Sequence, residues 1–233
     1  MVGFLIDFIK NPGKQIDTVR VALNGYGTFK EVFIEQQYLW LLNQFRPHTT
    51  VLDIGAHLGD TAAYFAASKD VDNVFGYEPV PIFAHEALLN KNLSPFRDKI
   101  KIINKAVTHD GKSRAIPSNY GGFNFLSLPL DRRGQQIDSL TLAEILEGNI
   151  YGAISPNLRS LKNVAIKSDC EGAEKFFFKE ADLSEVYAIE CECHDDVYAY
   201  VSSILSKKGF RVTGKVLHHQ KGSQLKMLYA VKQ

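Results

Sequence analysis

Residues 51–60 read Val-Leu-Asp-Ile-Gly-Ala-His-Leu-Gly-Asp, and this stretch decides the fold. The apolar residues before Gly55 predict a short buried strand, and the run from Thr61 to Ser68 predicts a helix directly after it. Gly55 and Gly59 stand at the junction, where glycine lets a ligand approach the backbone closely. The stretch therefore predicts a strand, a ligand-binding turn and a helix.

A second apolar run, from Val74 to Tyr77, ends at Glu78, about 25 residues after Asp53. An acid about 20 residues after a glycine-rich turn is the usual ligand of ribose hydroxyls in nucleoside-binding α/β folds. We therefore expect a cofactor that contains a nucleoside, with Glu78 accepting hydrogen bonds from its ribose.

The residues of the turn distinguish between two cofactors. A dinucleotide site needs a third, middle glycine because the pyrophosphate sits on bare backbone, but here that place holds His57, whose backbone we expect to face the cofactor. Asp53 before the turn would also repel a pyrophosphate. S-adenosylmethionine carries a sulfonium and an ammonium group and no phosphate, so the turn favours it over NAD. An ordinary α/β turn with incidental acids is the alternative.

The composition is that of a soluble globular protein, with 233 residues, 45% hydrophobic and 23% charged. The net charge of +1 gives no support for a nucleic-acid partner. The three cysteines, Cys170, Cys191 and Cys193, form neither a disulfide framework nor a Cys-x-x-Cys zinc motif. The apolar N-terminus, Val2 to Ile9, is too short to span a membrane and resembles an amphipathic helix more than a signal peptide. We therefore expect a cytoplasmic protein without a transmembrane segment.

Strand-like and helix-like runs alternate after residue 49, which predicts an α/β fold with a mainly parallel sheet and helices on both faces. The last two strands have no helix between them, so they predict a hairpin with one antiparallel strand. We expect strands near residues 51–54, 74–78, 100–104, 163–167, 186–191, 210–216 and 225–231, and helices near 60–68, 81–92, 141–147, 172–180 and 195–208.

We divide the chain into a helical N-terminal extension, residues 1–48, and a main domain, residues 49–233. Interruptions at residues 11–13 and 24–27 break the extension, and the apolar spacing from Phe29 to Phe45 predicts a helix that covers the main domain. Residues 107–140 are rich in glycine and interrupt the alternation. We interpret them as a β-rich insertion, with a hairpin turn at Asp110-Gly111, that contributes to a substrate pocket; a solvated β excursion is the alternative.

A second group of candidate residues follows the expected strand 163–167. Ligands of open α/β sheets bind outside the carboxyl ends of the strands, so Asp169 and Glu171 should line one crevice with Asp53 and Glu78. The alternative is a capping box formed by Ser168 and Glu171 at the start of the next helix.

The next strand contributes three more polar side chains. Alternation places Glu190, Glu192 and His194 on one face of this strand. His194 is a candidate base because its ordinary pKa lies near 6.5, and the alternative is a histidine at a strand end beside a solvated acidic helix start. A divalent-metal site built from Asp169, Glu190 and His194 is a further alternative to a site without metal.

Together these motifs resemble the FkbM family of S-adenosylmethionine-dependent methyltransferases over residues 49–195. The resemblance rests on residues 51–60, 77–79, 137–142 and 167–174. The last stretch, Lys-Ser-Asp-Cys-Glu-Gly-Ala-Glu, is the most specific. It departs from the family pattern at Ser168 and Cys170, where apolar residues are usual.

The resemblance implies a Rossmann-like class I methyltransferase fold, with seven strands of which one is reversed near the edge. It implies methyl transfer from S-adenosylmethionine to oxygen, often a hydroxyl of a sugar or a polyketide-type secondary metabolite, so the expected partner is a small-molecule hydroxyl acceptor. An RNA methyltransferase of related fold and a non-catalytic nucleoside-binding or interaction protein on the same scaffold are the alternatives.

The candidate site residues follow from the motifs and the resemblance taken together. The resemblance implies that Asp169 and Glu171 face the reacting end, and we assign the role of base or substrate clamp to Asp169, Glu171 and His194. The expected cofactor contacts are Asp53, Gly55, His57, Gly59, Glu78, Asn104 and Asp169.

Overall fold

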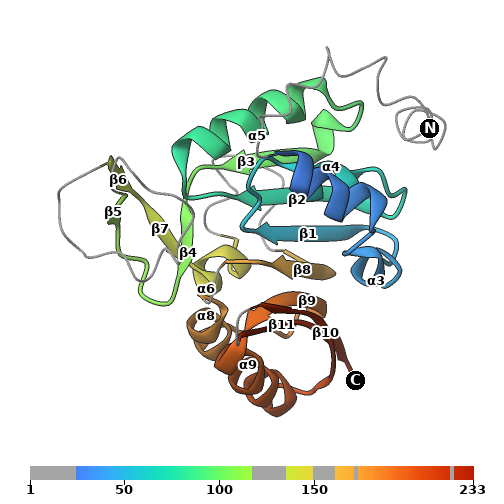
Figure 1. Ribbon diagram of the computed structural model, residues 1–233, viewed down its shortest axis with the longest axis vertical. Helices are drawn as coiled ribbons and strands as arrows, with labels where there is room; N and C mark the ends of the chain where they lie inside the picture. Colours follow the sequence, from blue (N-terminus) through green and yellow to red (C-terminus); the bar gives the residue numbers. More distant parts are fainter. Residues whose placement is uncertain (1–24, 117–134, 149–160, 171–172, 221–222) are drawn as a thin grey trace.

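A computed structural model describes residues 25–116, 135–148, 161–170, 173–220 and 223–233 (Figure 1). The expected N-terminal amphipathic helix, the central part of the 107–140 insertion, and Glu171 lie outside these residues. So do the side chains of His194, Asp195 and Asp196.

A seven-stranded sheet with the order β10-β11-β9-β8-β1-β2-β3 forms the centre of the fold. Four neighbouring pairs are parallel, and β11 is antiparallel to both of its neighbours, as the missing helix before it predicts. Seven strands with one reversed near the edge are the arrangement that the resemblance implies. The strands are β1 Thr49–Ile54, β2 Val71–Tyr77, β3 Ile100–Ile103, β8 Val164–Ser168, β9 Val186–His194, β10 Phe210–Gln220 and β11 Ser223–Lys232.

Helices cover both faces of the sheet because each buried strand is apolar on both sides. Leu52 packs in a cluster with Phe178 of α8, whereas its neighbour Val51 packs on the opposite face with Phe65 of α4. All five expected helices of the main domain are present. They are α4 Asp60–Ala66, α5 Pro81–Leu93, α6 Leu142–Leu146, α8 Glu174–Glu180 and α9 Asp195–Lys207, with a short 3-10 turn, η2, at Arg97–Lys99.

The segment before β1 is helical but differs from the expected single helix. It forms α2 Gly25–Phe29, a π-helical turn η1 Lys30–Ile34 and α3 Leu39–Leu42, so the expected interruption at 24–27 is wrong from Gly25 onward. The break lies instead at Gln36, whose φ of 54° cannot continue a right-handed helix. This turn lets Tyr38 and Leu41 pack into the core beside Phe65.

Four short strands build the described part of the insertion. β4 Ala106–Thr108 pairs with β7 Ser139–Thr141, and β5 Arg114–Ile116 pairs with β6 Gln135–Ile137. The expected hairpin at Asp110-Gly111 is therefore wrong, because the strands that flank it pair with other strands.

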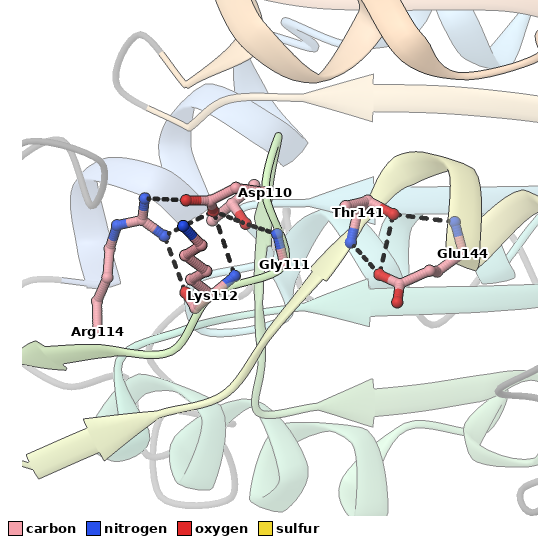
Figure 2. Close-up of polar contacts among 7 residues, drawn as sticks. Asp110, Gly111, Lys112, Arg114, Thr141 and Glu144 are labelled. Atoms are coloured by element: carbon pink, nitrogen blue, oxygen red, sulfur yellow. Dashed lines mark hydrogen bonds and ion pairs between the residues drawn. The ribbon is translucent and has the colours of Figure 1, made fainter. Parts of the chain in front are cut away.

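Side-chain hydrogen bonds fix this region (Figure 2). Arg114 donates to both carboxylate oxygens of Asp110 at 3.2 Å. Although burial opposes it, these bonds and that from the backbone N–H of Lys112 lower the pKa of Asp110 to about 2. Thr141 and Glu144 form a capping box at the start of α6. Within the described residues, no helix is long and apolar enough to cross a bilayer.

Candidate active site

The turn after β1 brings the ends of two strands together. Gly55 has a φ of +80°, and a Cβ atom there would lie 1.9 Å from the carbonyl oxygen of Asp169. The backbone N–H of Asp169 in turn donates to the carbonyl of Ile54 at 3.0 Å. Gly55 is therefore required by contact with the β8 end as well as by its left-handed backbone, and Asp169 lies beside the turn as the sequence predicts.

The second glycine and the histidine between them shape the start of α4. Gly59 has a φ of +81°, and a Cβ there would lie 3.2 Å from the Cβ of Ala87, so its absence allows close packing of α5. The ring of His57 packs edge-on against Phe83 with 4.5 Å between centroids. Burial and the charge of Lys167 lower the pKa of His57, which favours the neutral ring.

The carboxylate of Glu78 docks onto this turn. Its Oε2 accepts a hydrogen bond from the backbone N–H of His57 at 2.9 Å, and its Oε1 accepts one from Val80 at 2.8 Å. Burial outweighs these bonds and raises the pKa of Glu78 to about 7. Each carboxylate oxygen can accept a second hydrogen bond, so Glu78 is held in place while keeping acceptor positions for hydroxyl groups.

Asn104, which follows β3, is hydrogen-bonded to the backbone of the Glu78 segment. Its Nδ2 donates to the backbone carbonyls of Glu78 at 2.8 Å and Pro79 at 3.0 Å. These two bonds use both amide hydrogens. In this arrangement Asn104 fixes the backbone that carries the acid, and its Oδ1 is the atom that remains for a ligand.

A buried ion pair links β1 to β8. Asp53 and Lys167 are side by side in the strand register, with 3.2 Å between Oδ1 and Nζ. Thr61 also donates to Asp53 at 2.5 Å, and Lys167 donates to the carbonyl of Gly55 at 2.7 Å. Although burial lowers the pKa of Lys167, the charges of Asp53 and Asp169 outweigh it and raise this pKa above its ordinary value. Lys167 is thus a buried, charged side chain that connects β8 to β1 and to the backbone of the turn.

The same register row continues to Glu190 on β9, which lies beside Lys167 and is fully buried. Its Oε2 accepts a hydrogen bond from the backbone N–H of Leu41 at 2.9 Å, and its Oε1 accepts none from the described residues. Burial, only partly offset by the Leu41 bond and the charge of Lys167, raises the pKa of Glu190 to about 8.

The segment before β1 contributes residues that the sequence motifs did not reveal. Tyr38 is 4% exposed and its ring centroid lies 5.5 Å from the Nζ of Lys167. Gln37 donates to Glu192 at 2.7 Å, and Thr28 donates to Asp60 at 2.9 Å. The spacing of aromatic residues between Phe29 and Phe45 was the available signal, but it indicated only a helix that covers the domain.

The remaining candidates after β8 are only partly placed. Asp169 is half-buried at the strand end, and the buried carboxylate of Glu174 accepts a hydrogen bond from the backbone N–H of Cys170. The capping-box alternative is wrong, because α8 begins after Ala173 without a side-chain cap. Among the residues whose side chains are described, no group of three His, Cys, Asp or Glu could hold a metal ion.

A family model described as "Methyltransferase FkbM domain" matches residues 53–212, and no curated protein matches the sequence.

Several solved structures are similar over most of the chain. The precorrin-6y C5,15-methyltransferase of Geobacter metallireducens GS-15 has 13% identity and a TM-score of 0.47, covering 85% of this chain and 88% of that one. The tRNA methyltransferase TrmK of B. subtilis has 9% identity and a TM-score of 0.49, covering 85% and 66%. A methyltransferase FkbM of Methylobacillus flagellatus KT has 13% identity and a TM-score of 0.48, covering 97% and 60%.

Proposed function

This chain belongs to the FkbM family of methyltransferases, and we propose that it binds S-adenosylmethionine at the Gly55–Gly59 turn and methylates a hydroxyl group of a small molecule. The observation that carries the proposal is the docked carboxylate of Glu78. Two backbone N–H groups orient it beside the turn and leave acceptor positions for the two ribose hydroxyls.

The buried ion pair changes the role that we propose for Asp53. Its carboxylate is fully buried and bound by Lys167 and Thr61, so it acts on the cofactor through these residues rather than by contact. The methionyl end would then meet the backbone of the turn and the half-buried Asp169. Asp169, Glu171 and His194 remain our candidates for the base or substrate clamp.

The cofactor would supply a methyl group on a sulfonium, which an alcohol oxygen can attack in line. The contribution of the chain is alignment of the two reactants and removal of the hydroxyl proton. The rigid attachment of Asp169 to the β1 end, through its backbone bond to Ile54, supports a role in both, because it fixes a carboxylate next to the cofactor turn.

The charges around the turn favour a neutral acceptor over a nucleic acid. Asp169 lies beside the turn and Asp60 directly follows it, whereas the ammonium of Lys167 is buried and bound to Asp53 and Gly55. A phosphate-bearing acceptor would therefore meet repulsion at the described part of the site. Methylation of RNA instead would require strongly salt-dependent RNA binding.

Calorimetric titration with S-adenosylmethionine and S-adenosylhomocysteine tests the cofactor, with NAD as the control ligand. We expect micromolar binding of the first two, weakened at least tenfold by Glu78→Ala because ribose hydrogen bonds to a charged group are lost. Glu180→Ala is the matched control, since the Glu180 side chain is 69% exposed on α8. Failure of the wild-type protein to bind either compound contradicts the proposal.

Transfer of a labelled methyl group tests the acceptor. The protein is incubated with labelled S-adenosylmethionine and either a panel of sugars and polyketide-type alcohols or total RNA. We expect label in an alcohol of the panel. Label in RNA, lost as salt is raised, would contradict the small-molecule acceptor while leaving the cofactor assignment intact.

A further inference from the structure

Residues 25–42, which we call the N-terminal wall, lie outside the span matched by the family model. The wall nevertheless bonds to acids on both sides of the candidate site. Thr28 binds Asp60 directly after the cofactor turn, and Gln37 binds Glu192 on β9. In the sheet β8 lies between β9 and β1, and α4 follows β1. Val32, Tyr38 and Leu41 of the wall pack with residues of these three strands, so the wall runs along one face of β9, β8 and β1.

The end of the wall is anchored in the core of the protein. Leu41 is fully buried, and its backbone N–H is bound to the buried carboxylate of Glu190. Trp40 packs against Tyr229 with 4.9 Å between ring centroids. These contacts fix the backbone on the carboxyl side of Tyr38, so the position of the Tyr38 ring is set by β9 and β11 as well as by its own segment.

Tyr38 is connected to the cofactor turn through Lys167. Its ring lies over the Nζ of Lys167, and that Nζ donates to the carbonyl of Gly55. An edge-to-face contact with Phe65, 6.2 Å between centroids, holds the other side of the ring. A single side chain, Lys167, therefore separates Tyr38 from the first glycine of the turn.

The hydroxyl group is what distinguishes Tyr38 from an ordinary core aromatic. Burial of a hydroxyl costs free energy unless it is hydrogen-bonded, and phenylalanine would fill a purely structural place without that cost. Burial, followed by the charges of Asp169 and Glu192, raises the pKa of Tyr38 well above its ordinary value. The phenol therefore keeps its proton, and its oxygen can both donate and accept a hydrogen bond.

We propose that the N-terminal wall closes the acceptor side of the methyl-transfer site and that the Tyr38 hydroxyl contacts the group at the methyl position of the bound cofactor. The inference rests on the proposed function, because it assigns a residue to the reacting end of that same site. It gives the segment outside the family model a direct part in the reaction.

Two ligands that differ only at the reacting end test this contact. S-adenosylhomocysteine has nothing at the methyl position, whereas sinefungin carries an amino group there. We expect Tyr38→Phe to bind S-adenosylhomocysteine within about twofold of wild type. It should bind sinefungin about tenfold more weakly, because the Tyr38 oxygen no longer accepts a hydrogen bond from the charged amine.

Tyr187→Phe is the matched control. Tyr187 is also a buried tyrosine, and its hydroxyl is hydrogen-bonded to Thr49 at the opposite, amino end of β1, 2.7 Å away. Its removal tests the general effect of deleting a buried phenol hydroxyl. We expect the ratio of the two affinities to stay at the wild-type value in this variant.

Trp40, the single tryptophan of the chain, reports whether the wall stays docked. A Tyr38→Phe protein with wild-type emission and a tenfold lower preference for sinefungin supports the inference. If this variant fails to fold, the Trp40 emission of the wild-type protein is compared with each ligand bound. The inference then predicts a larger emission shift with sinefungin than with S-adenosylhomocysteine.

Three results overturn the inference. An unchanged ratio of sinefungin to S-adenosylhomocysteine affinity in Tyr38→Phe would show that Tyr38 does not make the contact. Equal emission shifts with both ligands would show the same, and neither result would affect the proposed function. Failure of wild-type protein to bind S-adenosylhomocysteine contradicts the proposed function itself, and the inference falls with it.

Discussion

The proposed cofactor side and the proposed acceptor side of the candidate site are built in opposite ways. On the cofactor side, Glu78 is held by backbone N–H groups of the turn and of its own loop. On the acceptor side, Lys167 and Glu190 are neighbouring buried ionisable residues, and the N-terminal wall covers Glu190 through the backbone of Leu41. One side depends on backbone geometry and the other on side chains brought together from distant parts of the chain. Substitutions on the two sides should therefore have different effects on stability and ligand affinity.

The largest effect is expected from Lys167→Met, which breaks the link between the two sides. Asp53 would remain buried without its counter-charge, so we expect a loss of roughly 3–5 kcal/mol in unfolding free energy, measured by urea denaturation. The double variant Asp53→Asn/Lys167→Met should recover much of it. Lys30→Met, at a half-exposed lysine, should change stability by less than about 0.5 kcal/mol. Equal losses in the single and double variants would show that the charge pair is not the cause.

Gly55→Ala tests the backbone construction of the cofactor side. The new Cβ would collide with the Asp169 carbonyl in addition to the cost of a left-handed backbone, so we expect a loss of roughly 2–4 kcal/mol. Gly209→Ala is the matched control, because its φ is +84° but no atom lies within 4 Å of the added Cβ. It should lose only about 1–2 kcal/mol in thermal unfolding, and similar losses at both positions would refute the close approach of β1 and β8.

The pH dependence of stability tests the acceptor side. Burial raises the pKa of Glu190 from its ordinary 4.5 to about 8, so the neutral acid is fully stabilising below about pH 4.5 and this contribution is lost as pH rises through 8. Wild-type stability should therefore fall more steeply between pH 5 and 8 than that of Glu190→Gln, which stays neutral. If the two proteins gave parallel curves of stability against pH, Glu190 would be ionised in the folded state over the whole range from pH 5 to 8, which contradicts the prediction.

The smallest effect is expected where the wall meets the cofactor side. Thr28→Val keeps the shape of the side chain and removes the hydrogen bond to the half-buried carboxyl group of Asp60. We expect a loss of about 1 kcal/mol in unfolding free energy, with unchanged S-adenosylhomocysteine affinity. A tenfold drop in that affinity would mean that the wall holds the cofactor as well as the acceptor side.

The contrast between the two sides also explains what the sequence could predict. Gly55, Gly59 and Glu78 lie in one strand–turn–helix–strand unit, which fixes their spacing along the chain. That spacing can be recognised directly in the sequence. Lys167 is a charged residue in an otherwise apolar strand, but its neighbours Asp53 and Glu190 follow only from the strand order. Tyr38 left no local pattern, since a buried aromatic in a helical segment has the same sequence signature whether or not it faces a site.

The most direct test of the account is the affinity for S-adenosylhomocysteine at pH 6 and pH 8, measured by calorimetry on wild type and Glu78→Gln. With a pKa of about 7, Glu78 gains its charge over this interval, so wild-type affinity should rise severalfold, up to about tenfold. Glu78→Gln should bind weakly at both pH values. A wild-type affinity that does not change with pH, or the same rise in Glu78→Gln, would contradict the assignment of Glu78 as the ribose acceptor.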